Sequence, residues 1–108
     1  MAAASKHSRA LNRLNPLAIK NATKPGFYHD GGGLYLQISR SGTKNWIYRF
    51  TIDKATRDMG LGAVAVWPLA KVRERLIGLR QLVSQKIDPI ERQRTERVAA
   101  QDAVEKQK

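Results

Sequence analysis

The chain has 108 residues, no cysteine and a formal net charge of +11, from 20 Lys and Arg against 9 Asp and Glu. This length suits one small domain with a modest core, and the absence of cysteine excludes disulfides and thiolate metal sites. The positive charge, which is greatest in the N-terminal half, indicates a polyanionic partner.

Other classes of protein and site are disfavoured by the residue pattern. No apolar run approaches the roughly 18 residues of a membrane span, and the first residues lack the apolar core of a signal peptide. His7 and His29 have no second ligand at a metal-binding spacing. We therefore expect a cytoplasmic protein with no membrane partner, no metal and no cofactor.

The N-terminal segment divides into two parts. Residues 1–13 carry Lys6, Arg9 and Arg13 among small and polar residues, which predicts a mobile basic arm that can enter a minor groove. Next, Asn15 can cap a helix whose first position is Pro16, so a short helix is predicted to end near residue 22.

Three consecutive glycines in HDGGGLYLQI, residues 29–38, allow either a phosphate-binding loop or a turn. A phosphate loop requires a helix after the glycines. Here the following residues alternate between apolar and polar at period two, which is typical of a half-buried strand. Because Asp-Gly tolerates the positive φ of tight hairpins, the sequence predicts a hairpin joining strands 27–30 and 34–39.

Two further strands follow, separated by short turns. Residues 45–52 alternate aromatic with mostly polar side chains, and a shorter strand is expected at 57–62 after the turn DKAT. Consecutive strands joined by short turns predict an antiparallel meander of three to four strands.

The pattern changes to a helical period after Gly62, with one long amphipathic helix predicted over 69–86 and ended by Pro89. Its predicted apolar stripe comprises Leu69, Val72, Leu76, Leu79 and Val83, widened by Ile77 and Leu82. Packing this stripe on the apolar face of the sheet gives an α+β fold with one long helix on one face.

The other face of the sheet is then left open, and we assign it as the candidate binding surface. The candidate residues are Tyr35, Gln37, Arg49 and Thr51 on the face, with Lys44, Lys54 and Arg57 at its rim. In the major groove of DNA, Arg can read guanine and Gln can read adenine. Alternatively, Trp46, Tyr48 and Phe50 form a platform for stacking single-stranded bases, although the helix needs these same residues as its core.

Residues 91–108 are polar all round and rich in helix formers, which predicts a frayed helix or a disordered linker. The sustained apolar seam of a coiled coil is missing. A protein-interaction role of this segment is a third hypothesis for the function.

The order of motifs resembles the N-terminal arm-type DNA-binding domain of phage and genomic-island integrases, which are tyrosine recombinases. The resemblance covers about residues 14–90, and its motifs are LNPLAIKNA, DGGGLYLQISRSGTKNWIYRF, LGAV, LAKVR and KIDPI. Pro68 stands where the family tends to have serine, Lys86 where it has glycine, and DKATR lacks the family's Gly-Lys-Arg.

The resemblance implies sequence-specific binding of double-stranded DNA at arm-type sites through the sheet. It also implies other integrase protomers as partners, and a catalytic tyrosine in a separate C-terminal domain. The three tyrosines of this chain lack the supporting His-x-x-Arg string, so we expect a module without catalytic residues. The alternative function is a small basic RNA-binding or ribosome-associated protein, which the charge alone equally allows.

Overall fold

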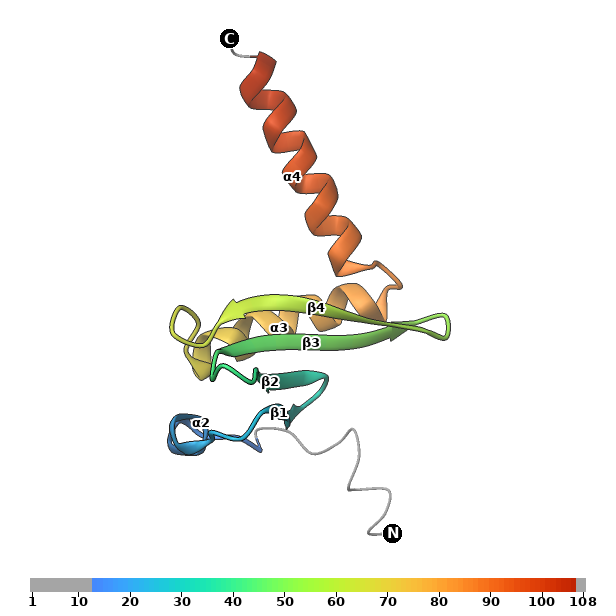
Figure 1. Ribbon diagram of the computed structural model, residues 1–108. Coiled ribbons are helices and arrows are strands. Elements are labelled where there is room, and N and C mark those ends of the chain that lie inside the picture. The colour runs from blue at the N-terminus through green and yellow to red at the C-terminus, as the bar shows by residue number, and fades with distance from the viewer. Residues whose placement is uncertain (1–12, 107–108) are drawn as a thin grey trace.

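The computed structural model describes residues 13–106, with side chains described to residue 101. A four-stranded antiparallel sheet of order β1-β2-β3-β4 has one face covered by the long helix α3 (Figure 1). The elements are α2 (Pro16–Asn21), β1 (Gly26–Gly31), β2 (Leu34–Ile38), β3 (Lys44–Ile52), β4 (Ala55–Ala63), α3 (Leu69–Ser84) and α4 (Pro89–Lys106). The predicted α+β meander is therefore confirmed. Of the predicted arm at residues 1–13, residues 1–12 lie outside the described residues.

Helix α2 begins as its sequence predicts. The side chain of Asn15 accepts a hydrogen bond from the backbone N–H of Ala18 at 2.8 Å, and Pro16 occupies the first turn. The N-terminal cap and the fixed φ of proline together favour a helix start at this position. The single buried residue of α2, Ile19, joins the core.

The glycines between β1 and β2 turn the chain, and no helix follows them. Gly31, Gly32 and Gly33 all have positive φ, between 62° and 118°. At Gly33 a side chain is also excluded by space, because a Cβ would lie 2.5 Å from the carbonyl oxygen of Arg49 on β3. The predicted hairpin is confirmed, and Gly33 allows the turn to approach β3 closely.

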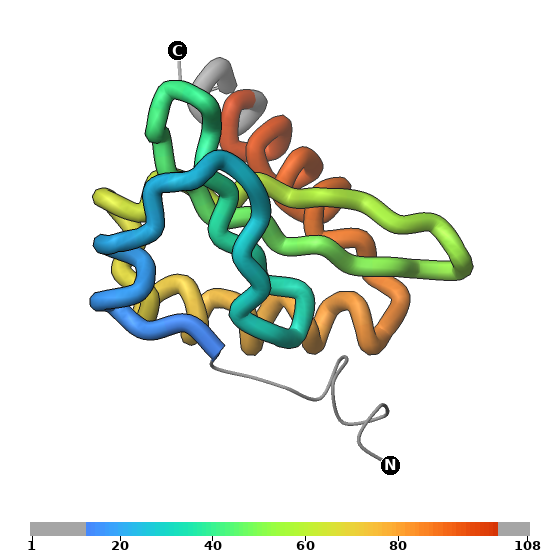
Figure 2. The backbone as a smooth tube through the Cα atoms, turned by 60° about the horizontal axis from the view of Figure 1, so that its bottom comes forward, coloured from blue at the N-terminus to red at the C-terminus, as the bar shows by residue number. Residues whose placement is uncertain are grey.

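The β3–β4 hairpin is the longest part of the sheet and extends beyond the β1–β2 hairpin (Figures 1 and 2). Its two turn residues, Asp53 and Lys54, both have positive φ, as a tight two-residue hairpin turn requires. Strand β4 begins at Ala55 and is therefore longer than the predicted 57–62. A register shift between Trp46 and Ile47 marks a bulge in the ladder.

The core lies between α3 and one face of the sheet. Trp46 is 0% exposed, and Tyr48 and Phe50 are 3% and 5% exposed, so these rings are core and not a stacking platform. The remaining buried apolar residues are Ile19, Leu34, Leu36, Ile38, Met59, Leu61, Leu69, Val72 and Leu76. The prediction that Ile77 widens the helix stripe is wrong: it lies about 100° around the helix from Leu76 and is 58% exposed.

Helix α3 ends at Ser84 and is followed by the left-handed Lys86, and α4 then begins at Pro89 and projects away from the sheet (Figure 1). Asp88 caps α4 by accepting hydrogen bonds from the N–H groups of Ile90 and Glu91. Arg57 of β4 pairs with Asp88 at 2.7 Å and with Glu91 at 3.4 Å. The segment for which we expected a frayed helix or a linker is thus helical through Lys106 and tied to the sheet at its first turn.

Candidate nucleic-acid interface

The open face is the face of the sheet that α3 does not cover. Side chains on successive strand residues alternate between the two faces, and the pairing of the strands then identifies the residues of each face. The open face comprises Phe27 and His29 from β1, Tyr35 and Gln37 from β2, Asn45, Ile47, Arg49 and Thr51 from β3, and Thr56 and Asp58 from β4.

Four of the seven predicted site residues lie together on the open face. Tyr35 and Arg49 are in direct contact, with the guanidinium carbon 4.9 Å from the centre of the tyrosine ring. Thr51 lies opposite Thr56, and their hydroxyl oxygens are 2.8 Å apart. Gln37 pairs with Asn45 across the β2–β3 ladder. The alternation of β2 and β3 therefore places these four residues as expected.

Two predicted rim residues lie instead on the helix side of the sheet. Lys44 pairs with Ile38, which is in the core, and its ammonium donates to the carbonyl oxygens of Ile19 and Lys20 at 2.6 and 3.2 Å. Arg57 pairs with Phe50, also a core residue, and reaches the start of α4. Their placement at the rim of the open face is corrected: both cations hold helix ends.

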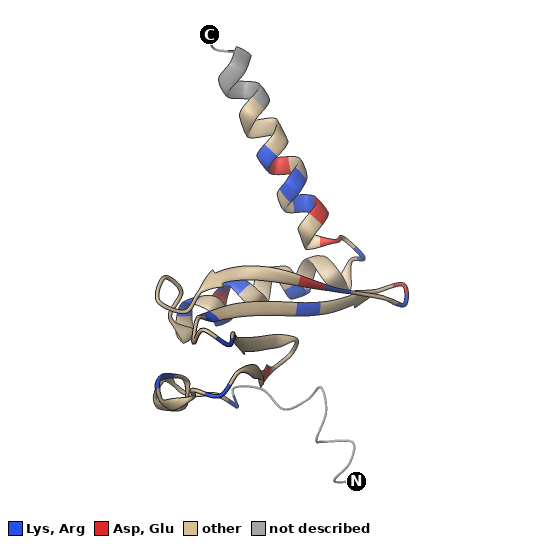
Figure 3. Cartoon of the chain, viewed as in Figure 1, with Lys and Arg blue, Asp and Glu red and all other residues tan. Residues whose placement is uncertain are grey.

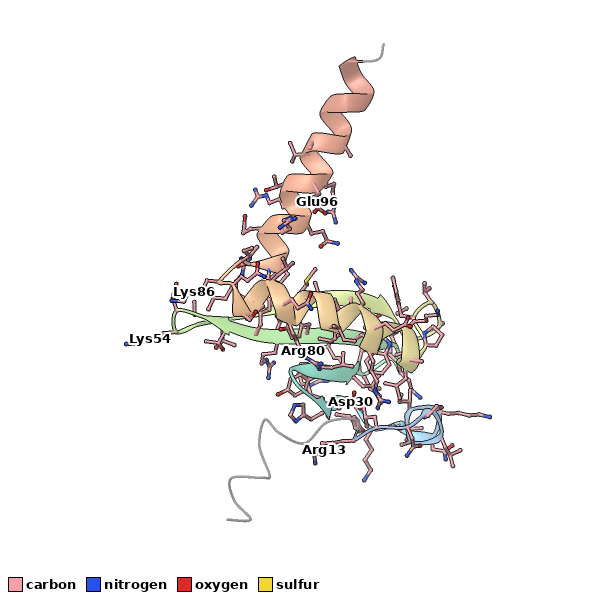
Figure 4. All side chains as sticks on the ribbon, turned by 180° about the vertical axis from the view of Figure 1, so that it is seen from behind. Arg13, Asp30, Lys54, Arg80, Lys86 and Glu96 are labelled. Carbon is pink, nitrogen blue, oxygen red and sulfur yellow. The ribbon has the colours of Figure 1, made fainter. Side chains whose placement is uncertain are left out.

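The remaining predicted residue, Lys54, lies at the tip of the β3–β4 hairpin (Figure 4). Lys86, beyond the end of α3, lies near this tip and pairs with Asp53 at 3.1 Å. Figure 3 shows that Lys and Arg are distributed over the N-terminal helix, the sheet, the hairpin tip and the first turns of α4. The positive charge is therefore spread over the molecule rather than gathered in one patch.

Arg49 is held on the open face by three neighbours. Its Nε and Nη2 donate to the two carboxylate oxygens of Asp58, at 2.7 and 3.0 Å. Its guanidinium also lies over the rings of Phe27 and Tyr35, at 5.4 and 4.9 Å from their centres. The hydrogen bond with Asp58 raises the pKa of Arg49, and the same bond lowers the pKa of Asp58. Both groups are thus charged at neutral pH.

His29 stacks on Tyr35 with the ring centres 4.6 Å apart, at the edge of the same cluster. Burial lowers the pKa of His29 below its ordinary value, and the charge of Arg13 lowers it further, while Asp30 opposes the shift. Arg13 Nη1 lies 3.5 Å from His29 Nδ1. The imidazole is therefore neutral at pH 7 and contributes an aromatic surface.

Two arginines of α3 fix the strands behind the open face. Arg73 donates to both carboxylate oxygens of Asp30, at 3.0 and 2.8 Å, and Asp30 is 2% exposed. Arg80 donates to the carbonyl oxygens of Gly32 and Gly31, at 3.0 and 3.2 Å, and thereby holds the glycine turn (Figure 4). Because the β1–β2 hairpin is anchored to α3 at these points, the open face is a preformed surface.

Sequence reasoning missed Phe27, His29 and the pairing role of Asp58. The first two were detectable, because antiparallel pairing across a tight hairpin places alternate β1 residues on the same face as Tyr35. The partnership of Asp58 with Arg49 follows from the two-residue turn at 53–54, which sets the register of β3 and β4. No helix within residues 13–106 is long and apolar enough to cross a membrane.

Comparison with known proteins gives consistent matches. Residues 14–96 match the sequence family described as "Arm DNA-binding domain". The chain is 34% identical over 73 residues to the "Integrase" of Shigella phage Sf6 and, equally, to the "Prophage integrase IntS" of Escherichia coli (strain K12). It is 42% identical over 65 residues to the "Integrase" of Enterobacteria phage P4.

These alignments cover 68%, 68% and 56% of this chain but only 19%, 19% and 14% of the respective relatives. The chain therefore spans about a fifth of the length of the curated relatives, or less. The matched part is the arm DNA-binding domain, and no match to a catalytic domain is among these findings.

Proposed function

Because the chain belongs to the arm DNA-binding domain family, we propose that its open face binds double-stranded DNA sequence-specifically in the major groove. The observation that carries the proposal is the uncovered sheet face, where Tyr35, Gln37, Arg49 and Thr51 project opposite to α3. These side chains supply hydrogen-bond donors and acceptors of the kind that read base edges.

The size of the open face supports this mode of binding. Neighbouring strands lie about 4.8 Å apart, so the two central strands of the face form a narrow two-stranded ribbon. The major groove of B-DNA is about 12 Å wide and admits two-stranded ribbons. The central strands β2 and β3 carry the proposed base-reading residues, and β1 and β4 lie on either side of them.

The proposed contacts divide into base readout and phosphate binding. Arg49 and Gln37 lie near base edges, whereas Lys54 at the hairpin tip lies near a phosphate. Residues 1–13 add phosphate or minor-groove contacts as a basic arm. Lys44 and Arg57 are left out of the DNA contacts, because their charged groups already bind helix ends on the other face.

The names of the relatives that the chain matches support a proposal for its wider role. Three of them are named integrases. We infer that this module holds arm-type sites during phage-type DNA recombination, together with other integrase protomers, while strand cleavage belongs to a different domain. No residue of the open face is assigned a catalytic role.

Selection from random duplexes, followed by a mobility-shift comparison, tests the proposal. The selected duplex is compared with a scrambled duplex, double-stranded RNA and single strands at two salt concentrations. We expect the selected duplex to bind tightest at both. Stronger binding to RNA would favour the alternative of an RNA-binding or ribosome-associated protein. Absence of binding to any of these nucleic acids at low salt would exclude both functions.

Substitutions then locate the surface. Arg49→Ala should cost about 1–3 kcal/mol of binding free energy on the selected duplex and relax the preference among sites. Lys54→Ala should weaken binding to every duplex alike and reduce the salt slope by about one. Lys71→Ala is the matched control, because Lys71 is exposed on α3 and its pairing among the described side chains is with Glu74 at 3.7 Å.

NMR shift mapping with the selected duplex provides an independent readout. Perturbations should centre on Tyr35, Gln37, Arg49 and Thr51. Perturbations centred on α3, with these four residues unchanged, would show that the other surface binds DNA.

A further inference from the structure

Asp58 places an acidic group on the surface that is proposed to bind a polyanion. Its carboxylate and the Arg49 guanidinium form a bidentate pair, with side chains 44% and 38% exposed respectively. An exposed ion pair of this kind contributes little to folding. A carboxylate beside a phosphate backbone is unfavourable, so its position on the open face, opposite Arg49 on the edge strand β4, calls for a role in recognition.

The geometry of the pair determines which donors of Arg49 remain. A guanidinium carries five N–H groups, and Asp58 uses one on Nε and one on Nη2. Three remain, and one on Nη1 and one on Nη2 lie side by side at the end of the planar group. This end-on fork matches the O6 and N7 acceptors of guanine.

The rings of Phe27 and Tyr35 restrict the guanidinium further. Both rings lie within 5.4 Å of its central carbon, on the same face of the sheet as Asp58. The side chain is therefore held by a carboxylate at one edge and by aromatic contacts, which lowers the conformational entropy that it loses on binding. The free end of the fork is the part left for a partner.

The pair also changes the electrostatics of the face. Arg49 and Asp58 together carry no net charge, so Arg49 contributes little to the release of counterions from DNA, which drives non-specific binding. A lone arginine at this position would bind phosphates of any sequence. When Arg49 is paired with Asp58, it gains binding free energy chiefly from two adjacent acceptors that match its end-on pair of N–H groups.

We propose that Asp58 is a positioning residue that directs Arg49 to a guanine base and suppresses its binding to phosphates. This inference rests on the proposed function, since it assumes that the open face binds duplex DNA. It assigns to the site a G·C base pair, contacted end-on through Nη1 and Nη2 of Arg49.

The first test compares Asp58→Asn with wild type on the selected duplex and a scrambled duplex over a range of salt. Freed from its carboxylate, Arg49 should contact a phosphate and steepen the slope of log K against log salt by about 0.9. The preference for the selected duplex should fall roughly tenfold. Glu74→Gln is the matched control: it removes the same charge from an exposed position on α3.

The second test replaces each guanine of the selected duplex in turn by 7-deazaguanine, which lacks the N7 acceptor. Wild type should lose affinity at one guanine, and Arg49→Lys, which keeps the charge but lacks the fork, should be insensitive there. Thermal unfolding shows whether Asp58→Asn is folded. If it is not, Arg49→Lys still tests the guanine contact.

The outcomes separate the two proposals. If no duplex is selected, the proposed function fails before this inference is tested. If a duplex is selected but Asp58→Asn behaves like Glu74→Gln, Asp58 has no role in recognition. Indifference of the wild type to 7-deazaguanine at every position would exclude the guanine contact while leaving duplex binding intact.

Discussion

Trp46 is near the start of β3 with its ring in the core, and its indole N–H donates to the carbonyl oxygen of Trp67 at 2.7 Å. Its neighbours in sequence face the opposite side of the sheet. A substitution at this residue therefore reports on folding, whereas one at Arg49 reports on recognition.

Trp46→Ala should lower the free energy of unfolding by about 3–5 kcal/mol, because it leaves a large cavity and an unpaired carbonyl. Denaturant unfolding measures this loss. Trp46→Phe, which keeps most of the ring volume and removes the indole N–H, should lose much less. Unchanged stability combined with lost DNA binding would mean that the two faces of the sheet had been assigned the wrong way round.

His29 gives a pH-dependent prediction at the open face. Its pKa in the free protein lies below the ordinary 6.5, because burial and Arg13 disfavour the imidazolium. The imidazole of His29 therefore takes up a proton more readily in the unfolded chain than in the folded protein. As a result, the free energy of unfolding decreases as the pH falls from about 6.5 through the pKa of His29 in the folded protein. Bound phosphates favour the imidazolium, so a duplex should raise the pKa and bind more tightly at lower pH.

An NMR titration of His29 with and without the selected duplex measures this shift, and His29→Gln distinguishes its signal from that of His7. The expected result is a higher pKa in the complex. An identical pKa in both states would place His29 away from the phosphates.

At the scale of elements, the C-terminal end of α3 uses a lysine where a glycine is usual. Lys86 has φ +62°, its N–H donates to the carbonyl of Val83, and the N–H of Ile87 donates to that of Leu82. This is the Schellman pattern, in which glycine avoids the strain of a left-handed residue. The only described pairing of Lys86 is with Asp53, and both side chains are well exposed.

Lys86→Gly should therefore raise the free energy of unfolding by about 0.5–1 kcal/mol, since relief of the strain exceeds the loss of an exposed ion pair. Lys86→Ala separates the two effects, because it removes the pair but keeps the left-handed Cβ, and should change stability little. Chemical denaturation measures both variants. A destabilised glycine variant would show that the pair with Asp53 outweighs the strain.

The sequence predicts the elements well where the pattern is local. The alternation in residues 34–38 and 45–52, the cap at Asn15 and the helical period after Leu69 each identify an element whose stabilising contacts lie nearby in sequence. Helix α4 was predicted only as a frayed helix or a linker, because its polar residues give no apolar period. Its start combines the local cap at Asp88 with an ion pair to Arg57, which is distant in sequence.

The candidate site was predictable only in part. Alternation places Tyr35 and Arg49 correctly, and the same rule puts Lys44 on the side of Trp46, contrary to its expected place at the rim. The side of the sheet on which Arg57 lies could be predicted only from the register that the turn at 53–54 sets. The partners of these cations, Ile19 and Asp88, come from distant segments and are visible only in the folded chain.

At the scale of the whole molecule, positive charge comes from both the folded domain and the N-terminal residues. Deleting residues 1–12 removes Lys6 and Arg9. If these residues bind phosphates, the deletion should weaken duplex binding and reduce the salt slope by about two, while the unfolding transition stays the same. A mobility shift over a salt series and a thermal melt test both points. An unchanged salt slope would exclude the arm from binding.

The connection of α4 to the sheet has a mechanical consequence. An 18-residue helix is about 27 Å long, and its first turn is joined to β4 through Arg57, Asp88 and Glu91. With such a lever, a tilt of about 10° at Asp88 displaces the region of Lys106 by about 5 Å. Pro89 is fully buried and Ile90 packs against the core, so the two ion pairs act together with apolar contacts to fix the direction of α4 when the sheet docks. High salt, which screens the ion pairs, would weaken this restraint without unfolding either element.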